Sequence, residues 1–251
     1  IDTERDVVRA CEEFEFVNLY QGIYGLHGSH VGSLYVMLYW QQQEQLIAPD
    51  EFLPHIRQPE IWAKLLLQTL QRAVIECRIW HRQQPMLGLC VRISGREFNQ
   101  TGSLGDIIHL LHSHDFPLPY LTLEITVQDW LRMEARCKQT LQDLVAEGVR
   151  VSLHIEEVDD LCIPEFADEL FGQVKLGEAI TQEICSQEGP SAKVRRYLAI
   201  FRAMGIDMVA VGVENATQQR KLLSFGCNMM QGEAIHSPCH GDSVVQLLIG
   251  C

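Results

Sequence analysis

Short apolar runs rich in β-branched and aromatic residues recur along the chain, and most are separated by segments with helical spacing. The runs that predict β-strands cover residues 15–25, 33–40, 86–94, 120–126, 149–155, 172–177, 207–213 and 228–232. Amphipathic stretches between some of these runs predict helices over residues 60–80, 130–146 and 193–204. After the first two strands, the chain therefore has the pattern of a repeated β-α unit.

The link between the first two strands differs from the later links. Residues 25–32 (GLHGSHVG) are Gly-rich and too few for a crossover helix, so the two strands are predicted to be antiparallel neighbours. The later β-α units predict parallel strands with right-handed crossovers. A doubly wound sheet is the alternative, but no Gly-rich Rossmann or Walker turn follows the first parallel strand. We therefore expect an α/β fold, a (β/α)8 barrel with one antiparallel strand and its functional residues at the C-terminal strand ends.

The length and the net charge of the chain limit the number of domains and the classes of ligand to be expected. The 251 residues suffice for one large α/β barrel, and we expect a single domain over residues 1–251, cut from a longer protein because the chain begins at Ile1. No run of eighteen apolar residues is present, so no membrane segment is expected. The formal net charge of -13 argues against non-specific nucleic-acid binding, which needs basic side chains to neutralise phosphates. A small phosphate ligand in a local basic pocket stays possible.

The cysteine and histidine patterns suggest neither a disulfide framework nor a metal site. The chain has nine cysteines, no CxxC pair, and thiols such as Cys77 and Cys90 within apolar runs. Reduced thiols and a cytoplasmic location are favoured. His112 and His114 could indicate a metal, but a solvated loop between a helical run and a strand is the favoured interpretation.

Several short segments occur in an order and spacing that carry a family resemblance. They are LYQGI (19–23), YVMLYW (35–40), LIAPDEFLP (46–54), VRIS (91–94), LTLEITVQ (121–128), GVRVSLHIEE (148–157), QVKLG (173–177), AVGVE (210–214) and FGCNMMQGEAIHSP (225–238). Together they resemble the EAL-domain family of cyclic-di-GMP phosphodiesterases over nearly the whole chain. The resemblance implies an EAL-type, TIM-like barrel.

The same resemblance implies that the catalytic metal site is lost. Enzymes of this family resemble two-metal hydrolases, in which acidic side chains hold two hard cations. The resemblance places family metal-binding or acidic positions on Tyr35, Arg92, Val127, His154, Ile155 and Val211. Glu124, Glu214 and Lys175 are kept. Magnesium needs oxygen ligands in near-octahedral geometry, so we expect no catalytic residues, no bound metal and no enzymatic activity.

A new single-metal site is an alternative. Glu124, His154 and Glu214 are a workable ligand set for zinc. Arg92 in the same cluster would repel the metal and pair with a carboxylate itself, so the ion-paired arrangement is favoured.

Loss of catalysis need not mean loss of the ligand. We expect Arg92 to replace the cations by bidentate hydrogen bonding to phosphate, and a salt bridge between Arg92 and Glu124 is the alternative. The expected ligand-binding residues are Gln21, Met37, Leu38, Tyr39, Arg92, Glu124, Lys175, Glu214, Gln231, Gly232 and Pro238. Tyr39 stands where the family has a phosphate-binding arginine, and Glu233 where it has an aromatic residue, so both argue against tight binding. Trp40 could stack on a guanine, although packing beneath the neighbouring loop is favoured.

The function expected from this pattern is a non-catalytic cyclic-di-GMP receptor that binds without metal and signals to a protein partner. Residues 21–28 (QGIYGLHG) resemble the EAL domains of bacterial FimX-type regulators of type IV pili and twitching motility. That resemblance implies a degenerate GGDEF domain upstream and a PilZ-domain adaptor as partner. Two alternatives remain: a protein-interaction scaffold that no longer binds nucleotide, and a residual phosphodiesterase with an unfamiliar metal site.

Overall fold

The computed structural model describes residues 4–25, 30–99, 103–161, 170–232 and 235–249, and within them the strands form one ten-stranded sheet. The short strands β3 (Gln45–Ile47) and β10 (Cys239–His240) lie at its two edges, and the other eight close into a barrel. The barrel strands are β1 (Phe16–Gly25), β2 (Val31–Gln42), β4 (Gly88–Arg92), β5 (Leu121–Thr126), β6 (Arg150–Ile155), β7 (Gln173–Leu176), β8 (Asp207–Val211) and β9 (Met229–Gln231). Each overlaps one of the predicted strands.

The first strand closes the ring in the predicted orientation. β1 runs antiparallel to both of its barrel neighbours, β2 and β9, while the pairs from β2 through β4 to β9 are parallel. The prediction of a barrel with one antiparallel strand is thus confirmed. Because the other strands are parallel, their C-terminal ends gather at the same mouth.

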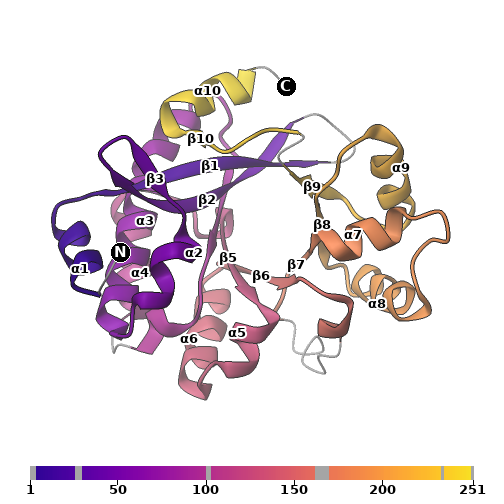
Figure 1. Ribbon diagram of the computed structural model, residues 1–251, viewed down its shortest axis with the longest axis horizontal. Helices are drawn as coiled ribbons and strands as arrows, with labels where there is room; N and C mark the ends of the chain where they lie inside the picture. Colours follow the sequence, from indigo (N-terminus) through magenta and orange to yellow (C-terminus); the bar gives the residue numbers. More distant parts are fainter. Residues whose placement is uncertain (1–3, 26–29, 100–102, 162–169, 233–234, 250–251) are drawn as a thin grey trace.

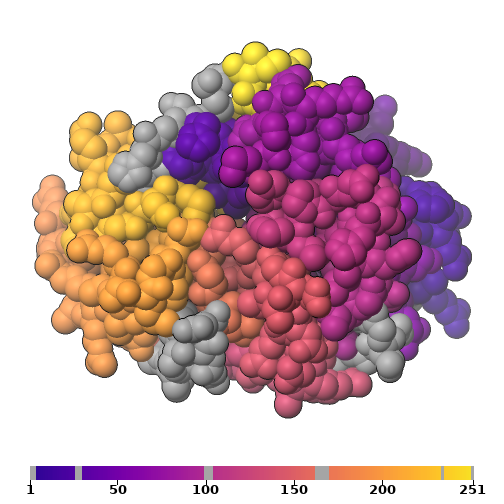
Figure 2. All heavy atoms as spheres, turned by 180° about the vertical axis from the view of Figure 1, so that it is seen from behind, coloured from indigo at the N-terminus to yellow at the C-terminus, as the bar shows by residue number. Residues whose placement is uncertain are grey.

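Helices surround the barrel (Figure 1). They are α1 (Glu4–Glu12), α2 (Pro49–Phe52), α3 (Pro59–Trp80), α4 (Ser103–Ser113), α5 (Val127–Arg132), α6 (Ala135–Ala146), α7 (Glu178–Cys185), α8 (Ala192–Ala203), α9 (Ala216–Ser224) and α10 (Gly241–Ile249). Single 3-10 turns occur at Leu53–His55, Arg96–Asn99, Leu118–Tyr120 and Val158–Asp160. Seen from behind, the magenta-to-pink middle of the chain adjoins the orange-to-yellow C-terminal part (Figure 2).

Two helical predictions need correction. The helix predicted over residues 130–146 is two helices, α5 and α6, because Met133 and Glu134 adopt extended backbone angles between them. His112 lies in the last turn of α4 rather than in a loop. His114 follows that helix, and its Nδ1 lies 2.9 Å from the carbonyl oxygen of Leu110, which is the contact of a helix end rather than of a metal ligand.

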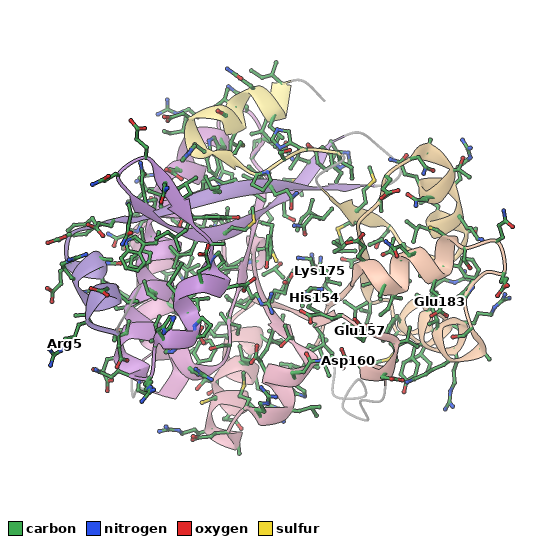
Figure 3. The ribbon with its side chains drawn as sticks, viewed as in Figure 1. Arg5, His154, Glu157, Asp160, Lys175 and Glu183 are labelled. Carbon is green, nitrogen blue, oxygen red and sulfur yellow. The ribbon has the colours of Figure 1, made fainter. Side chains whose placement is uncertain are left out.

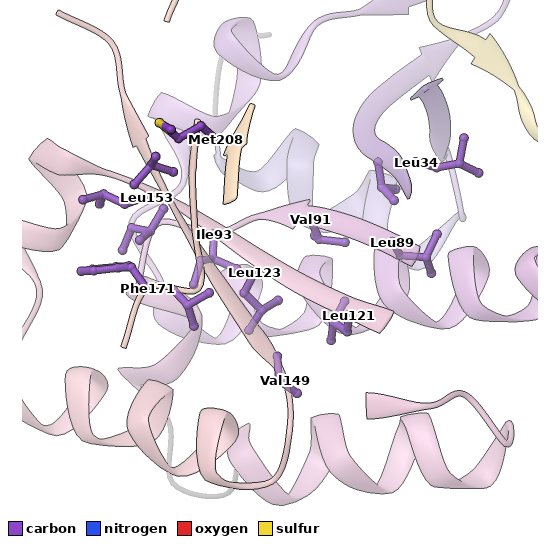
Figure 4. Close-up of a cluster of buried hydrophobic side chains, with 14 of the residues drawn as sticks. Leu34, Leu89, Val91, Ile93, Leu121, Leu123, Val149, Leu153, Phe171 and Met208 are labelled. Carbon is purple, nitrogen blue, oxygen red and sulfur yellow. The ribbon is translucent and has the colours of Figure 1, made fainter. Parts of the chain in front are cut away.

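The strands separate two environments by simple alternation of side chains. Leu121, Leu123 and Leu153 point away from the barrel axis and pack in the large apolar core between strands and helices (Figure 4). The alternate residues on the same strands, such as Glu124 and His154, face the barrel interior. The helix-facing side therefore holds the fold together, and the interior is free to carry polar groups.

Disulfide bonds and membrane-spanning helices are both absent from the described part of the chain. No disulfide links its cysteines, as the sequence predicted. None of its helices is both long and apolar enough to cross a membrane.

Candidate functional site

A fully buried carboxylate occupies the barrel interior near the C-terminal strand ends. Glu124 of β5 has no solvent-exposed surface, and its Oε2 lies 2.8 Å from the Nζ of Lys175 on β7. The Tyr35 hydroxyl on β2 donates a hydrogen bond of 3.1 Å to Glu124 Oε1. Burial alone would raise the pKa of Glu124, but Lys175 and then His154 outweigh it, so that the pKa lies below its ordinary value. The carboxylate is therefore ionised and fully engaged by the protein itself.

Tyr35 contacts both members of this ion pair. The Nζ of Lys175 lies 3.7 Å from the centroid of the Tyr35 ring, in cation–π geometry. Burial, followed by the charge of Glu124, raises the pKa of Tyr35 well above its ordinary value. The phenol thus stays protonated and keeps donating to Glu124. A thiol completes the lining, because Cys90 Sγ lies 3.8 Å from Glu124 Oε2.

His154 of β6 lies beside this group. Its Nδ1 is 3.7 Å from Glu124 Oε1 and 3.9 Å from Glu156 Oε1. Burial lowers the pKa of His154 to about 4, against the opposing effect of Glu124. The imidazole is therefore neutral at pH 7. Figure 3 shows His154 and Lys175 close together in the middle of the barrel, on adjacent strands.

Arg92 does not form the salt bridge with Glu124 that the sequence offered as an alternative. The two residues are partners in the β4–β5 register, but the Arg92 guanidinium lies 3.6 Å from Glu156 instead. The reason is that Lys175 and Tyr35 already satisfy Glu124 inside the barrel, while Arg92 ends β4 with 47% of its side chain exposed. Sequence reasoning did not single out Glu156, although its position directly after β6 is a signal that could have done so.

Two predicted ligand residues meet where the barrel closes. Gln231 Nε2 on β9 donates a 2.7 Å hydrogen bond to Gln21 Oε1 on β1, and Gln21 Nε2 donates to the His236 carbonyl at 3.0 Å. Both glutamines are buried, and within the described residues Gln231 Oε1 accepts no hydrogen bond. Gly232 directly follows β9, and its carbonyl accepts from the backbone of Ile235 and of His236. This pair thus links β1 to β9 through their side chains where the barrel closes.

Side-chain alternation divides the residues after Tyr35 on β2. Met37 and Tyr39 follow at two-residue intervals and so share its face of the strand. Leu38 lies on the opposite face, where it packs against the outer apolar cluster. This placement contradicts the expectation that Leu38 contacts a ligand at the barrel mouth. Trp40 is fully buried with its ring centroid 5.8 Å from that of Phe16, which confirms the packing role.

The remaining predicted residues are peripheral. Glu214 follows β8, is exposed, and its backbone N–H donates to Gln218 Oε1 at 2.7 Å. Pro238 is partly buried, one residue before β10. Among the described side chains, no group of three His, Cys, Asp or Glu has metal-binding geometry. The zinc site considered for Glu124, His154 and Glu214 is therefore not assembled.

The comparison with protein-family models decides the family. The model described as the EAL domain matches residues 4–238. The chain belongs to the EAL domain family. The fold and the family predicted from the sequence are thus confirmed, and the strand-end residues above belong to an EAL barrel.

Relatives of this EAL domain include a bacterial enzyme. The chain is 24% identical over 249 residues to the bifunctional diguanylate cyclase/cyclic di-GMP phosphodiesterase MucR of Pseudomonas aeruginosa, covering 96% of this chain and 35% of MucR. The chain thus spans about a third of the length of that relative.

Two solved structures show the same fold. The phosphodiesterase PaMucR in complex with c-di-GMP matches with a TM-score of 0.79 and 23% identity, covering 96% of this chain and 98% of that one. The Xanthomonas citri FimX EAL domain in complex with c-diGMP matches with a TM-score of 0.79 and 20% identity, covering 94% and 93%. At these identities the structural likeness establishes the barrel.

Proposed function

We propose that this EAL domain is a non-catalytic receptor for cyclic-di-GMP that binds the dinucleotide without metal. The observation that carries the proposal is the state of Glu124. Its two carboxylate oxygens are engaged by Lys175 and Tyr35 at 2.8 and 3.1 Å, in the interior of the barrel. A divalent cation at this position would have to displace the ammonium group of Lys175, whose side chain is 5% exposed.

The donor set does not fit a pair of magnesium ions. Magnesium binds oxygen ligands in near-octahedral geometry and is reluctant to shed its water. Near Glu124, the described side chains offer a phenol, a neutral imidazole and a guanidinium, together with Glu156, which Arg92 already contacts. Breaking the buried pair of Glu124 and Lys175 would also leave an uncompensated charge in the barrel. These features support the absence of the family's metal-dependent hydrolysis.

The ligand assignment rests on residues at the mouth of the barrel and on two solved structures with the same fold. The guanidinium of Arg92 is fixed at a strand end, partly exposed, and able to form bidentate hydrogen bonds with a phosphate. The amides of Gln21 and Gln231, where β1 meets β9, carry donors and acceptors of the kind that pair with the edge of a guanine. Two structural neighbours were solved with the dinucleotide bound. The ligand set then includes Gln21, Met37, Tyr39, Arg92 and Gln231, with Lys175 holding Glu124.

The proposal also includes a protein partner. The pattern at residues 21–28 and the match to a FimX EAL domain support a PilZ-domain adaptor, control of type IV pili and an upstream degenerate GGDEF domain. Part of that pattern, residues 26–28, lies outside the described residues.

A protein-interaction scaffold without nucleotide binding is the second candidate. Two observations favour it: Arg92 is already paired with Glu156, and Tyr39 stands where the family resemblance expects a cation.

A calorimetric titration with cyclic-di-GMP, run once with EDTA and once with Mg²⁺, separates these functions. Equal binding in both supports the receptor, no binding in either supports the scaffold, and linear dinucleotide product supports a residual enzyme.

Arg92→Ala should weaken binding by roughly 1.5–3 kcal/mol, because a charge-assisted phosphate bond is lost. Arg96→Ala, four residues further along and exposed, is the matched control and should leave affinity within about 0.5 kcal/mol. Unchanged affinity in Arg92→Ala would remove Arg92 from the site.

A further inference from the structure

A second ion pair spans the barrel mouth above the buried one. Arg92 ends β4, and Glu156 directly follows β6, so that their contact of 3.6 Å bridges the end of β5, which lies between those strands. Both side chains are about half exposed, at 47% and 44%. The cation best placed to receive a ligand phosphate is therefore held by a carboxylate of the protein itself.

The contacts of Glu156 show that this pair can open. The Glu156 carboxylate also lies 3.9 Å from Nδ1 of His154, and that imidazole is neutral at pH 7 because its pKa is about 4. A half-exposed ion pair is screened by water and contributes little to the stability of a fold. Glu124, in contrast, is held inside the barrel by Lys175 and by the hydroxyl of Tyr35. The outer pair can thus be exchanged for a ligand contact while the inner pair stays intact.

We propose that Glu156 is an internal competitor for the phosphate of the ligand: it occupies Arg92 in the free domain and is displaced by the anionic phosphodiester of the cyclic dinucleotide. The inference rests on the proposed receptor function and adds a determinant of affinity to it. Binding has to break the contact between Arg92 and Glu156, and it brings a phosphate close to a carboxylate. Both effects weaken binding, so Glu156 sets the ligand concentration to which the domain responds.

The test is Glu156→Gln, which removes the charge and keeps the shape of the side chain. In a titration with cyclic-di-GMP in EDTA, this variant should bind about threefold to tenfold more tightly than the wild-type domain, since an ion pair and a like-charge repulsion are both removed. Glu157→Gln is the matched control. It makes the same change in net charge one residue later, at an exposed position whose side chain makes no cap hydrogen bond to the turn at Val158–Asp160, and its affinity should stay within about twofold.

The Arg92→Ala background shows whether Glu156 acts through Arg92. In that background, the gain from Glu156→Gln should shrink to less than about twofold, because the two residues are coupled. A gain of the same size would overturn the proposal, since Glu156 would then act only as a general negative charge. Glu156→Ala removes the same charge with a different side chain and should shift affinity in the same direction.

The outcomes also separate this inference from the proposed function. Metal-independent binding by the wild type with an unchanged Glu156→Gln variant would reject the competitor and leave the receptor in place. Binding by neither protein would reject the receptor. Binding by the variant alone would support the competitor and reject the wild-type domain as a working receptor.

Discussion

At the residue scale, the site is governed by charge balance in a poorly solvated space. Glu124 is ionised because Lys175 lies 2.8 Å away, and the protonated phenol of Tyr35 donates to its other oxygen. A buried acid without such partners would bind a proton instead. His154, in contrast, is neutral. Its Nδ1 is buried and has no hydrogen-bond partner among the described residues. The cluster thus satisfies its single buried anion without an external cation.

The neutral state of His154 predicts an acid-sensitive fold. Its pKa is lowered from 6.5 to about 4, mainly by burial. Between these two pH values the unfolded chain binds a proton that the folded chain does not, so stability falls as the pH drops from about 6.5 to 4. Denaturant unfolding followed at several pH values should show this loss. In His154→Gln the loss over that window should be smaller by up to about 3 kcal/mol, at 1.36 kcal/mol per pKa unit. An identical pH profile in the variant would contradict the prediction.

At the scale of elements, local capping shapes the chain next to the site. The Thr126 hydroxyl, at the end of β5, accepts from the Asp129 backbone N–H at 3.1 Å and donates to the Asp129 carboxylate at 2.9 Å. The cap residue lies only two residues after Glu124, and α5 begins directly after it, at Val127. The turn fixes where β5 stops, and with it the depth of Glu124 in the barrel.

Removal of that cap should destabilise the domain. Thr126→Ala leaves the Asp129 N–H without its side-chain acceptor in a buried position, and we expect the free energy of unfolding to fall by about 1 kcal/mol. Thr140→Ala, in the middle of α6, is the control, because that residue caps no helix and its change should stay within about 0.5 kcal/mol. Urea unfolding of both variants measures the difference. Equal effects at the two sites would show that the Thr126 cap is not important.

At the scale of the whole molecule, barrel closure assembles the site. Tyr35, Glu124 and Lys175 come from β2, β5 and β7, and parallel pairing of β2 through β7 brings these distant segments to one mouth. The closure of β1 against β9 adds Gln21 and Gln231 from opposite ends of the chain. A ligand bound across this mouth would contact strands from both halves of the ring and should therefore stabilise the domain as a unit.

This arrangement predicts how thermal unfolding responds to ligand and metal. A ligand that binds only the folded state at one hundred times its Kd adds about 2.7 kcal/mol of stability. Cyclic-di-GMP at that excess should raise Tm in EDTA, and replacing EDTA with Mg²⁺ should change neither the free nor the ligand-bound Tm. Differential scanning calorimetry measures all four conditions. A rise in Tm that requires Mg²⁺ would contradict the metal-free site.

Much of the fold and part of the site follow from the sequence alone. Short apolar runs rich in β-branched and aromatic residues located every barrel strand. The Gly-rich link at residues 25–32 predicted the antiparallel pair, because eight residues cannot form a crossover. Glu124 and Lys175 were predicted as site residues from the family resemblance, and side-chain alternation then determines which face of its strand each residue occupies. The same alternation, counted from Tyr35, would have placed Leu38 on the outer face.

Only the tertiary structure decided which charged groups pair with one another. Arg92 and Glu124 are register neighbours, yet Glu124 takes Lys175, which is 51 positions away in the sequence, and Arg92 takes Glu156. The choice depends on depth along the barrel axis: the lysine approaches the carboxylate within the interior, while the guanidinium at the end of β4 lies nearer to water. Spacing in the sequence determines the face of a strand but not the distance across a closed barrel, so these partners required the folded molecule.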